Sequence, residues 1–258
     1  MIKALFFDID GTLVSFTTHQ IPQSTIDALR RAHASGVKII ISTGRPMSII
    51  NSIGAIKDLV DGYITMNGAC TIVNGKVISS LPISPDDVKT VLEVSDRFDV
   101  SCIVVGPTQL ALYNPQQSAV DIFDKLLAVP GLGQGVSVEE TLKGDVFQLT
   151  PFIDEDEEHE ALPLLKDVEV ARWYPAFCDI TRKGVSKAKG MEAIARYFGF
   201  DLKDTMGFGD GGNDIPMIQA AGIGVAMGNA NDSLKAVADY VTTSVDEDGV
   251  ANALAKFL

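Results

Sequence analysis

The sequence predicts an α/β protein with a parallel-sheet core and a second, α+β domain inserted into that core. Short apolar stretches alternate with helical stretches in the first third of the 258-residue chain, and again after about residue 184. Between these two blocks the chain has a different texture of hairpin-like and helical pieces. Acidic residues directly follow two of the predicted strands, and open α/β sheets bind their ligands at that edge.

The first block, residues 1–81, shows the alternation that is typical of a parallel sheet. Short apolar strands separated by helices favour a parallel sheet that is covered on both faces. A glycine, Gly36, ends the predicted helix. The predicted elements are strands over Ile2–Phe7, Lys38–Ser42 and Tyr63–Met66 and a helix over Ser24–Ala34.

The pattern changes over residues 82–183, which we expect to form the inserted domain. The flanking segments Leu81–Pro85 and Thr181–Gly184 are rich in turn residues and are the expected hinges. Asp86–Phe98 is a predicted helix, and the acidic run Asp154–Glu160 is interpreted as a solvated loop or helix start in preference to a metal site.

The core resumes over residues 184–258, with a helix through Met191, Ile194 and Phe198 that Gly199 ends, and strands over Thr205–Phe208, Ile223–Met227 and Asp239–Thr242.

Composition and charge exclude several classes of partner. Hydrophobic residues make up 46% of the chain, which is enough for a sizeable core. A formal net charge of −13 argues against nucleic acid or an anionic membrane as the main partner, because both attract basic patches. No stretch approaches the roughly 18 apolar residues of a membrane span. Three widely spaced cysteines, Cys70, Cys102 and Cys178, are interpreted as small core residues in a reducing compartment, so we expect a soluble cytoplasmic protein.

Two carboxylates, Asp8 and Asp10, end the first predicted strand. Residues i and i+2 of a strand point to the same side, so both carboxylates can face one small volume beyond the strand's end. An unpaired carboxylate in an apolar setting costs several kcal/mol, roughly, unless it is paired, metal-bound or protonated. The alternative is that both residues cap a turn before Gly11–Thr12.

The segment Gly207–Asp214 forms a second acidic cluster after another predicted strand. It satisfies the G-x-G-x-x-G pattern of dinucleotide-binding loops, which is weak evidence alone. Asp210 and Asp214 would repel a pyrophosphate, whereas together with Asp8 and Asp10 they offer the oxygen ligands that magnesium prefers. The sequence therefore predicts a magnesium site.

Two further segments suit an anion. Thr43 follows the strand Lys38–Ser42 and offers a hydroxyl and backbone N–H groups, although it could equally be a helix cap in an ordinary turn. Lys187 lies near a predicted helix start, where a cation and free N–H groups favour anions together. Lys183 and Lys189 lie close by, so lysine chemistry alone does not select Lys187.

Taken together, these segments resemble the haloacid dehalogenase superfamily, specifically its Cof-type sugar-phosphatase branch. The motifs D-x-D-G-T-L at 8–13, S-T-G-R at 42–45, G-V-S-K at 184–187 and G-D-G-G-N-D at 209–214 occur in the family's order and frame the whole chain. Thr65–Gly68 also resembles the family's N-G turn facing the substrate. One departure concerns the glycine that usually follows the motif lysine, because Ala188 stands there and the glycine is displaced to Gly190.

The resemblance implies a Rossmann-like parallel-sheet core with an inserted α+β cap domain, and it assigns roles to individual residues. Asp8 would be the nucleophile and Asp10 the general acid/base. Magnesium would be held by Asp8, Asp210 and the backbone carbonyl of Asp10, with Asp214 supporting these ligands. The substrate-binding residues would be Thr43, Gly44, Arg45, Asn67, Lys187 and Asn213.

The implied function is a magnesium-dependent phosphatase acting on small phosphorylated metabolites, with hexose or other sugar phosphates as the leading class. Covalent catalysis through an aspartyl-phosphate would divide one very slow reaction into two easier steps. A phosphomutase of the same superfamily and a non-catalytic sugar-phosphate sensor remain alternatives, and a hydride-transfer enzyme is more distant. The inserted domain would choose the leaving group, with Arg172, Trp173 and Asp179 as candidates that could equally have core or surface roles.

Overall fold

The computed structural model of the chain describes residues 1–126 and 136–258, apart from the side chains of residues 124–126 and Trp173. The chain divides into two compact units. Unit 1 comprises Met1–Arg45, Ile50–Ser80 and Ser186–Leu258, and unit 2 comprises Pro46–Ile49 and Leu81–Val185. The segment Pro46–Ile49, which sequence analysis places in the core, is thus grouped with unit 2.

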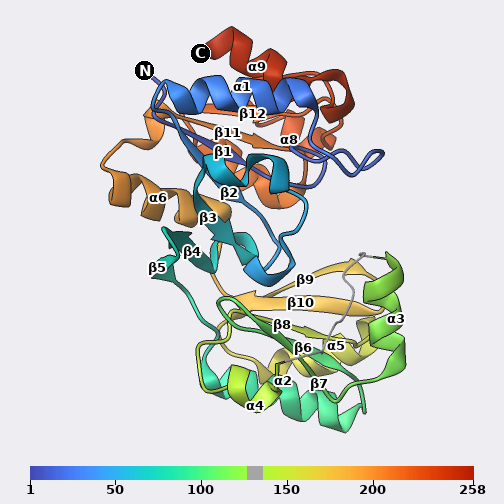
Figure 1. The fold of residues 1–258 in the computed structure, drawn as a ribbon. Coiled ribbons are helices and arrows are strands. Elements are labelled where there is room, and N and C mark those ends of the chain that lie inside the picture. Colours follow the sequence, from blue (N-terminus) through green and yellow to red (C-terminus); the bar gives the residue numbers. More distant parts are fainter. Residues whose placement is uncertain (127–135) are drawn as a thin grey trace. The chain divides into compact units, whose positions relative to one another are not determined.

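Unit 1 is built on an eight-stranded sheet with the order β13-β12-β11-β1-β2-β3-β4-β5 (Figure 1). The six strands from β13 to β3 run parallel, whereas β4 and β5 are antiparallel to their neighbours. The strands are β1 (Ala4–Phe7), β2 (Lys38–Ser42), β3 (Val60–Thr65), β4 (Cys70–Val73), β5 (Lys76–Ser80), β11 (Thr205–Gly209), β12 (Ile223–Ala226) and β13 (Tyr240–Val241).

Helices cover both faces of this sheet. α1 packs against α9 on one face and α6 packs against α7 on the other, as the alternating pattern predicts. Gly199 ends α6 in the left-handed conformation, with φ of 75°, where glycine meets no steric penalty. The helices of unit 1 are α1 (Gln23–Ala34), α6 (Lys187–Phe198), α7 (Ile215–Ala220), α8 (Asp232–Lys235) and α9 (Gly249–Phe257).

The antiparallel β4–β5 hairpin extends the parallel sheet, and sequence analysis did not predict it. Asn74 and Gly75 join the two strands, and both have positive φ, at 50° and 71°. An Asn-Gly pair with this conformation is the preferred two-residue turn of a β-hairpin. The predicted α/β class with a parallel core is confirmed, and the sheet as a whole is mixed.

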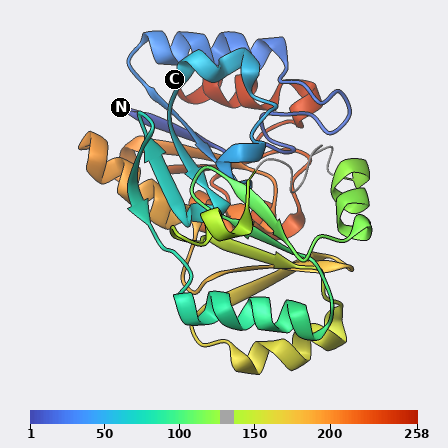
Figure 2. The ribbon, with the colours of Figure 1, turned by 60° about the horizontal axis from the view of Figure 1, so that its bottom comes forward.

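Unit 2 is a five-stranded antiparallel sheet with the order β7-β6-β8-β10-β9. α2 and α5 lie on one side of it and share a buried core with β6, β8 and β10 (Figure 2). The strands are β6 (Cys102–Val105), β7 (Leu110–Tyr113), β8 (Gln148–Pro151), β9 (Val168–Tyr174) and β10 (Phe177–Arg182), and the helices are α2 (Pro85–Arg97), α3 (Gln117–Leu126), α4 (Val138–Thr141) and α5 (Glu155–Ala161).

Several residues of unit 2 that sequence analysis left open have structural partners. Asp154 caps α5 in a capping box with Glu157, so the acidic run is a helix start. Arg172 contacts Glu158 at 2.6 Å and donates to backbone carbonyls, including Ile153 O at 3.0 Å, which is a structural role within this unit. Asp179 accepts a hydrogen bond from Thr150. The Trp173 side chain lies outside the described part.

Short 3₁₀ segments complete the chain. No helix in the described residues is long and apolar enough to span a membrane. Cys70, Cys102 and Cys178 are all buried thiols, as the composition predicts. The 3₁₀ segments are η1 (Met47–Ile49), η2 (Gly54–Leu59), η3 (Met66–Gly68), η4 (Leu162–Leu164), η5 (Leu202–Asp204), η6 (Gly212–Asp214) and η7 (Val245–Glu247).

Candidate active site

Asp8 lies at the carboxyl end of β1, in the middle of the unit 1 sheet. All four residues of β1 are buried between β11 and β2, which fixes the strand's end. The Asp8 N–H donates to Phe208 O at 3.0 Å, so the backbone continues the β1–β11 pairing one residue further. The carboxylate is therefore held beside the loop that follows β11, and only 8% of the residue is exposed.

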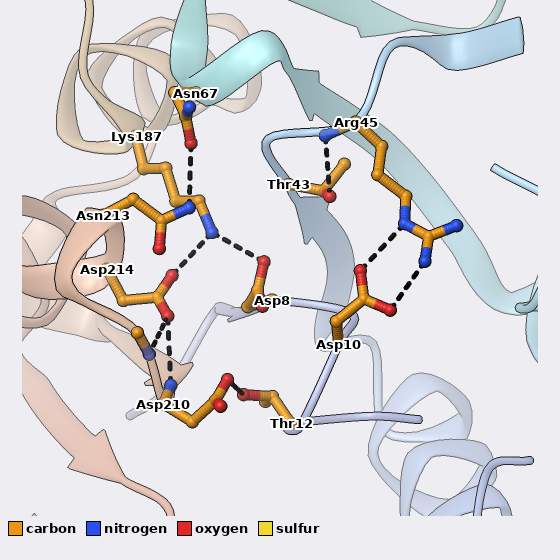
Figure 3. Close-up of polar contacts among 11 residues, drawn as sticks. Asp8, Asp10, Thr12, Thr43, Arg45, Asn67, Lys187, Asp210, Asn213 and Asp214 are labelled. Atoms are coloured by element: carbon orange, nitrogen blue, oxygen red, sulfur yellow. Dashed lines mark hydrogen bonds and ion pairs between the residues drawn. The ribbon is translucent and has the colours of Figure 1, made fainter. Parts of the chain in front are cut away.

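Lys187 connects Asp8 to the second acidic cluster. It is the first residue of α6, which Ser186 caps by accepting from Lys189 N. Its Nζ lies 2.6 Å from Asp8 Oδ1 and 2.6 Å from Asp214 Oδ1, and its side chain is fully buried (Figure 3). A buried ammonium must be paired, and here two carboxylates from distant parts of the chain pair with it.

Asp214 is buried and organises the loop after β11. Its Oδ2 accepts hydrogen bonds from Asp210 N at 3.0 Å and Gly211 N at 2.9 Å (Figure 3). In a dinucleotide-binding loop, N–H groups of this kind would bind the pyrophosphate. Here they donate to the Asp214 carboxylate instead. The G-x-G-x-x-G pattern serves close backbone packing here, because a Cβ on Gly209 would lie 2.5 Å from Asp214 Cβ.

Three carboxylates converge on one small volume. One oxygen from each of Asp8, Asp210 and Asp214 lies within 4.8 Å of the others. Asp210 is oriented by Thr12, whose hydroxyl donates to Asp210 Oδ1 at 3.1 Å. The Asp214 carboxylate is already occupied by Lys187 and two N–H groups, so it is better suited to supporting a metal site than to supplying its main ligand.

Burial governs the protonation of this cluster. It raises the pKa of Asp8 to about 7; Lys187 opposes this increase and Asp214 adds to it. It raises the pKa of Asp210 to about 6, and Asp214 again adds to the increase. For Lys187, burial lowers the pKa, but Asp214 and Asp8 outweigh it and hold the pKa above its ordinary value. Burial is the largest cause of both carboxylate shifts, so this site disfavours a charged carboxylate that has no partner.

Asp10 has a different partner from the other three carboxylates. Arg45 donates from Nε to Asp10 Oδ2 at 2.8 Å and from Nη2 to Asp10 Oδ1 at 2.8 Å (Figure 3). Such a two-pronged pair fixes both side chains in one plane. The Asp10 carboxylate is therefore turned to Arg45, and only its backbone was expected to serve a metal.

The remaining predicted residues lie on the loops after β2, β3 and β11. Thr43 is buried; its Oγ1 accepts from Arg45 N at 3.1 Å and its carbonyl accepts from Asn67 N at 3.0 Å. Asn213 donates to Asn67 Oδ1 at 3.0 Å, which joins two of these loops (Figure 3). Gly44 faces Asn67, because a Cβ on Gly44 would lie 3.3 Å from its Oδ1.

Sequence analysis gave no role to three supporting residues. Thr12 was quoted within a motif but given no role, and Asn229 was not singled out, although its amide donates to Gly11 O at 2.8 Å and its Oδ1 accepts from Val245 N. Gly190 stands where α6 meets β3, and a Cβ there would lie 2.3 Å from Ile64 Cγ2. The displaced glycine therefore allows α6 to approach the sheet and Lys187 to reach Asp8.

Comparisons with known proteins agree with this architecture. The family model of haloacid dehalogenase-like hydrolases matches residues 5–254. A solved structure described as the subclass IIB sugar phosphatase BT4131 is 50% identical, covers 99% of this chain and 98% of its own, and has a TM-score of 0.86. The Bacteroides thetaiotaomicron phosphatase BT1666 is 40% identical over 100% of this chain and 95% of its own, with a TM-score of 0.85.

Curated relatives extend the same similarity. YkrA of Bacillus subtilis is 32% identical over 98% of this chain and 96% of its own length. A 5-amino-6-(5-phospho-D-ribitylamino)uracil phosphatase of the same organism, YitU, is 28% identical over 97% of this chain and 95% of its own length. The chain belongs to the haloacid dehalogenase-like hydrolase family, in its Cof-type branch, and is a phosphatase.

Proposed function

We propose that this phosphatase is magnesium-dependent and hydrolyses sugar phosphates or closely related phosphorylated polyols through an aspartyl-phosphate on Asp8. The observation that carries the proposal is the convergence of the carboxylates of Asp8, Asp210 and Asp214 with the buried Lys187 ammonium at the carboxyl edge of the unit 1 sheet. The overall charge of −13 repels anions, so a phosphate ester must be held by these local groups.

The residues present suit a hard divalent cation. Their donors are carboxylate oxygens, which magnesium prefers, and the carboxylates of Asp8, Asp210 and Asp214 gather beside the Lys187 ammonium. Asp8, Asp210 and the Asp10 carbonyl would hold the ion, with Asp214 supporting them. When bound, magnesium supplies charge neutralisation at the phosphoryl oxygens and at the attacking carboxylate.

The chain's own residues would then carry out two balanced steps. In the first, a carboxylate oxygen of Asp8 forms a bond to phosphorus, the bond from phosphorus to the ester oxygen breaks, and Asp10 donates a proton to the departing alcohol. In the second, Asp10 takes a proton from water, the water oxygen bonds to phosphorus, and the bond to Asp8 breaks. Lys187 would neutralise the phosphoryl oxygens in both steps.

The Asp10–Arg45 pair bears on the acid/base role. The pair holds the Asp10 carboxylate against Arg45, with both of its oxygens 2.8 Å from guanidinium nitrogens, whereas the first step needs Asp10 to reach the ester oxygen of the substrate. We therefore propose that productive substrate binding loosens this pair, and that Arg45 also contacts the substrate. Thr43, Gly44, Asn67 and Asn213 would bind the phosphoryl group and the atoms next to it through their hydroxyl, N–H and amide groups.

The substrate class is supported by the named relatives. BT4131 is described as a sugar phosphatase, and YitU is named for a phosphorylated ribityl compound, so both substrates present a polyol beside the phosphate. We propose that residues 82–183 act as a cap that chooses among such leaving groups. The three buried thiols fit a reducing compartment, and we propose the cytoplasm as the protein's location.

Phosphate release across a panel of phosphorylated metabolites tests the proposal. We expect magnesium-dependent turnover of several sugar phosphates, with inorganic phosphate and the free, unrearranged sugar as products. An isomerised sugar phosphate without free phosphate would instead indicate the phosphomutase alternative. Asp58→Asn, at an exposed carboxylate of unit 1, is the matched control for loss of activity in Asp8→Asn. Turnover that survives exhaustive chelation would contradict the magnesium assignment.

A further inference from the structure

An aromatic side chain stands exposed directly beside the proposed metal ligands. Phe16 follows the first acidic motif by only a few residues and is 63% exposed. The neighbouring apolar side chains of this segment, those of Ile9, Leu13 and Val14, are buried in the core. Phe16 therefore does not serve core packing, although exposing a phenyl ring to water is unfavourable.

The Phe16 ring lies over Gly11, beside Asp210. A Cβ added to Gly11 would lie 2.6 Å from Phe16 Cε2 and 2.3 Å from Asp210 Oδ2. The edge of the ring and the carboxylate of Asp210 thus flank the same point of the backbone. Gly11 has φ of +78°, so glycine serves both the turn and the close approach of these two side chains.

The loop that carries Phe16 is built to hold it in place. The buried Ser15 accepts hydrogen bonds at its Oγ from Thr17 N at 3.0 Å and Thr18 N at 3.1 Å. The Ser15 backbone also accepts from His19 N at 2.9 Å and donates to Gln20 O at 3.1 Å, which closes the loop. A side chain presented on an ordered loop loses little further entropy when a ligand binds it.

We propose that Phe16 is a specificity-determining residue, which binds the apolar face of the sugar ring in the leaving group. This inference deepens the proposed function and depends on it. The charged and amide groups of the site suit the phosphoryl group, but they offer nothing to the C–H face of a sugar ring. Ligand sites combine a few polar groups with apolar and aromatic walls, and Phe16 provides an aromatic wall next to Asp210.

The test compares substrates with and without a ring in Phe16→Ala. The quantity is the ratio of kcat/KM for glucose 6-phosphate to kcat/KM for acetyl phosphate, which carries no sugar. Losing one aromatic contact should lower this ratio by roughly 2- to 10-fold, mainly through KM for the sugar phosphate. Tyr197→Ala, at a 50%-exposed aromatic residue of α6, is the matched control and should leave the ratio unchanged.

Two further variants separate stacking from loop damage. Phe16→Trp keeps a flat aromatic face and should retain the ratio, whereas Phe16→Leu keeps apolar bulk without a ring face and should lower it. This pair decides the question even if Phe16→Ala fails to fold. An unchanged ratio in Phe16→Leu would overturn the inference while leaving the proposed function intact, and so would an unchanged ratio in a folded Phe16→Ala. A wild-type protein that hydrolyses no phosphate ester would overturn the proposed function, and this inference with it.

Discussion

At the residue scale, the positions of the acidic residues after β1 and β11 were predictable, but their partners were not. Alternation along a strand and the edge rule for parallel sheets suffice to place Asp8 and Asp210 near each other. That Lys187, and neither Lys183 nor Lys189, reaches Asp8 depends on the start of α6 at residue 187 and on the fit of Gly190 against Ile64. The Asp10–Arg45 pair depends on side-chain rotamers, which no sequence pattern specifies.

The acid/base role of Asp10 predicts a dependence on the leaving group. Asp10→Asn should reduce kcat for a sugar phosphate by roughly 10²- to 10⁴-fold, because a sugar alkoxide must be protonated as it leaves. The rate constant of the first step with p-nitrophenyl phosphate should fall much less in this variant, because nitrophenolate leaves without a proton. Rapid-quench measurement of nitrophenolate release in Asp10→Asn and wild-type protein compares the two. Equal losses for both substrates would contradict the role of Asp10 as the acid.

At the element scale, the sequence predicts the parallel strands of unit 1 and the helices α1, α2 and α6. It does not place the β4–β5 hairpin, the individual strands of unit 2 or the helices α7, α8 and α9. β2 spans the predicted Lys38–Ser42, and α6 ends at the predicted Gly199. β1 is shorter than predicted, since Ile2 and Lys3 lie outside the ladder. The Asn74–Gly75 pair is a readable signal for the β4–β5 hairpin in the sequence.

The approach of α6 to the sheet predicts a structural cost at Gly190. In Gly190→Ala the added methyl group would lie 2.3 Å from Ile64 Cγ2, so helix and strand must separate. We expect a loss of about 1–3 kcal/mol in the free energy of unfolding, and lower kcat because Lys187 moves with α6. Urea denaturation of Gly190→Ala, Ile64→Ala and the double variant measures the coupling.

The control for this prediction is Gly54→Ala, because a Cβ on Gly54 meets nothing within 4 Å. If the clash is the cause, the double variant will lose less free energy of unfolding than the sum of the losses in Gly190→Ala and Ile64→Ala. Simple additivity would show that Gly190 matters for another reason.

At the scale of the whole molecule, the change in sequence texture suggested an insertion over residues 82–183, and the structure groups Leu81–Val185 in one unit. Pro46–Ile49 belongs to the same unit although it is far away in sequence, and no composition signal marks it. Apolar strands that form a covered sheet leave a pattern in the sequence, whereas the grouping of a short loop with a distant segment leaves none.

The proposed cap predicts a separation of specificity from chemistry. If residues 82–183 are replaced by a short linker and unit 1 stays soluble, discrimination among sugar phosphates should fall sharply. Slow, magnesium-dependent hydrolysis of acetyl phosphate should persist, because Asp8, Asp210 and Lys187 all belong to unit 1. The measurement is the spread of kcat/KM values over several sugar phosphates in both proteins. An unchanged spread of kcat/KM values would show that residues of unit 1 determine the specificity.

Metal binding should couple to pH through the whole protein's stability. Without metal, the pKa of Asp8 is raised to about 7 and that of Asp210 to about 6, from an ordinary 3.8. Because the folded-state values are raised, the stability these groups contribute is fully present below about pH 4 and is lost as pH rises through 6 and 7. Magnesium favours the ionised carboxylates, so it should restore stability most at high pH.

Thermal unfolding at pH 5 and pH 8, with and without magnesium, measures this coupling. The increase in Tm on adding magnesium should be larger at pH 8. Below the pKa of a carboxyl group that binds the metal, magnesium must displace a proton, which weakens binding by up to about tenfold per pH unit. Asp210→Asn should lose most of the magnesium effect at pH 8. Equal increases in Tm at both pH values would contradict the linkage.

The most direct test of the account is to trap the phosphorylated protein. Wild-type protein mixed with a ³²P-labelled sugar phosphate and magnesium, and quenched in acid within milliseconds, should carry label on the tryptic peptide Ala4–Arg30, and mass spectrometry should locate it at Asp8. Asp8→Asn should carry none, whereas Asp58→Asn should label like wild type. Full turnover without label on the protein, or label at another residue, would contradict covalent catalysis by Asp8.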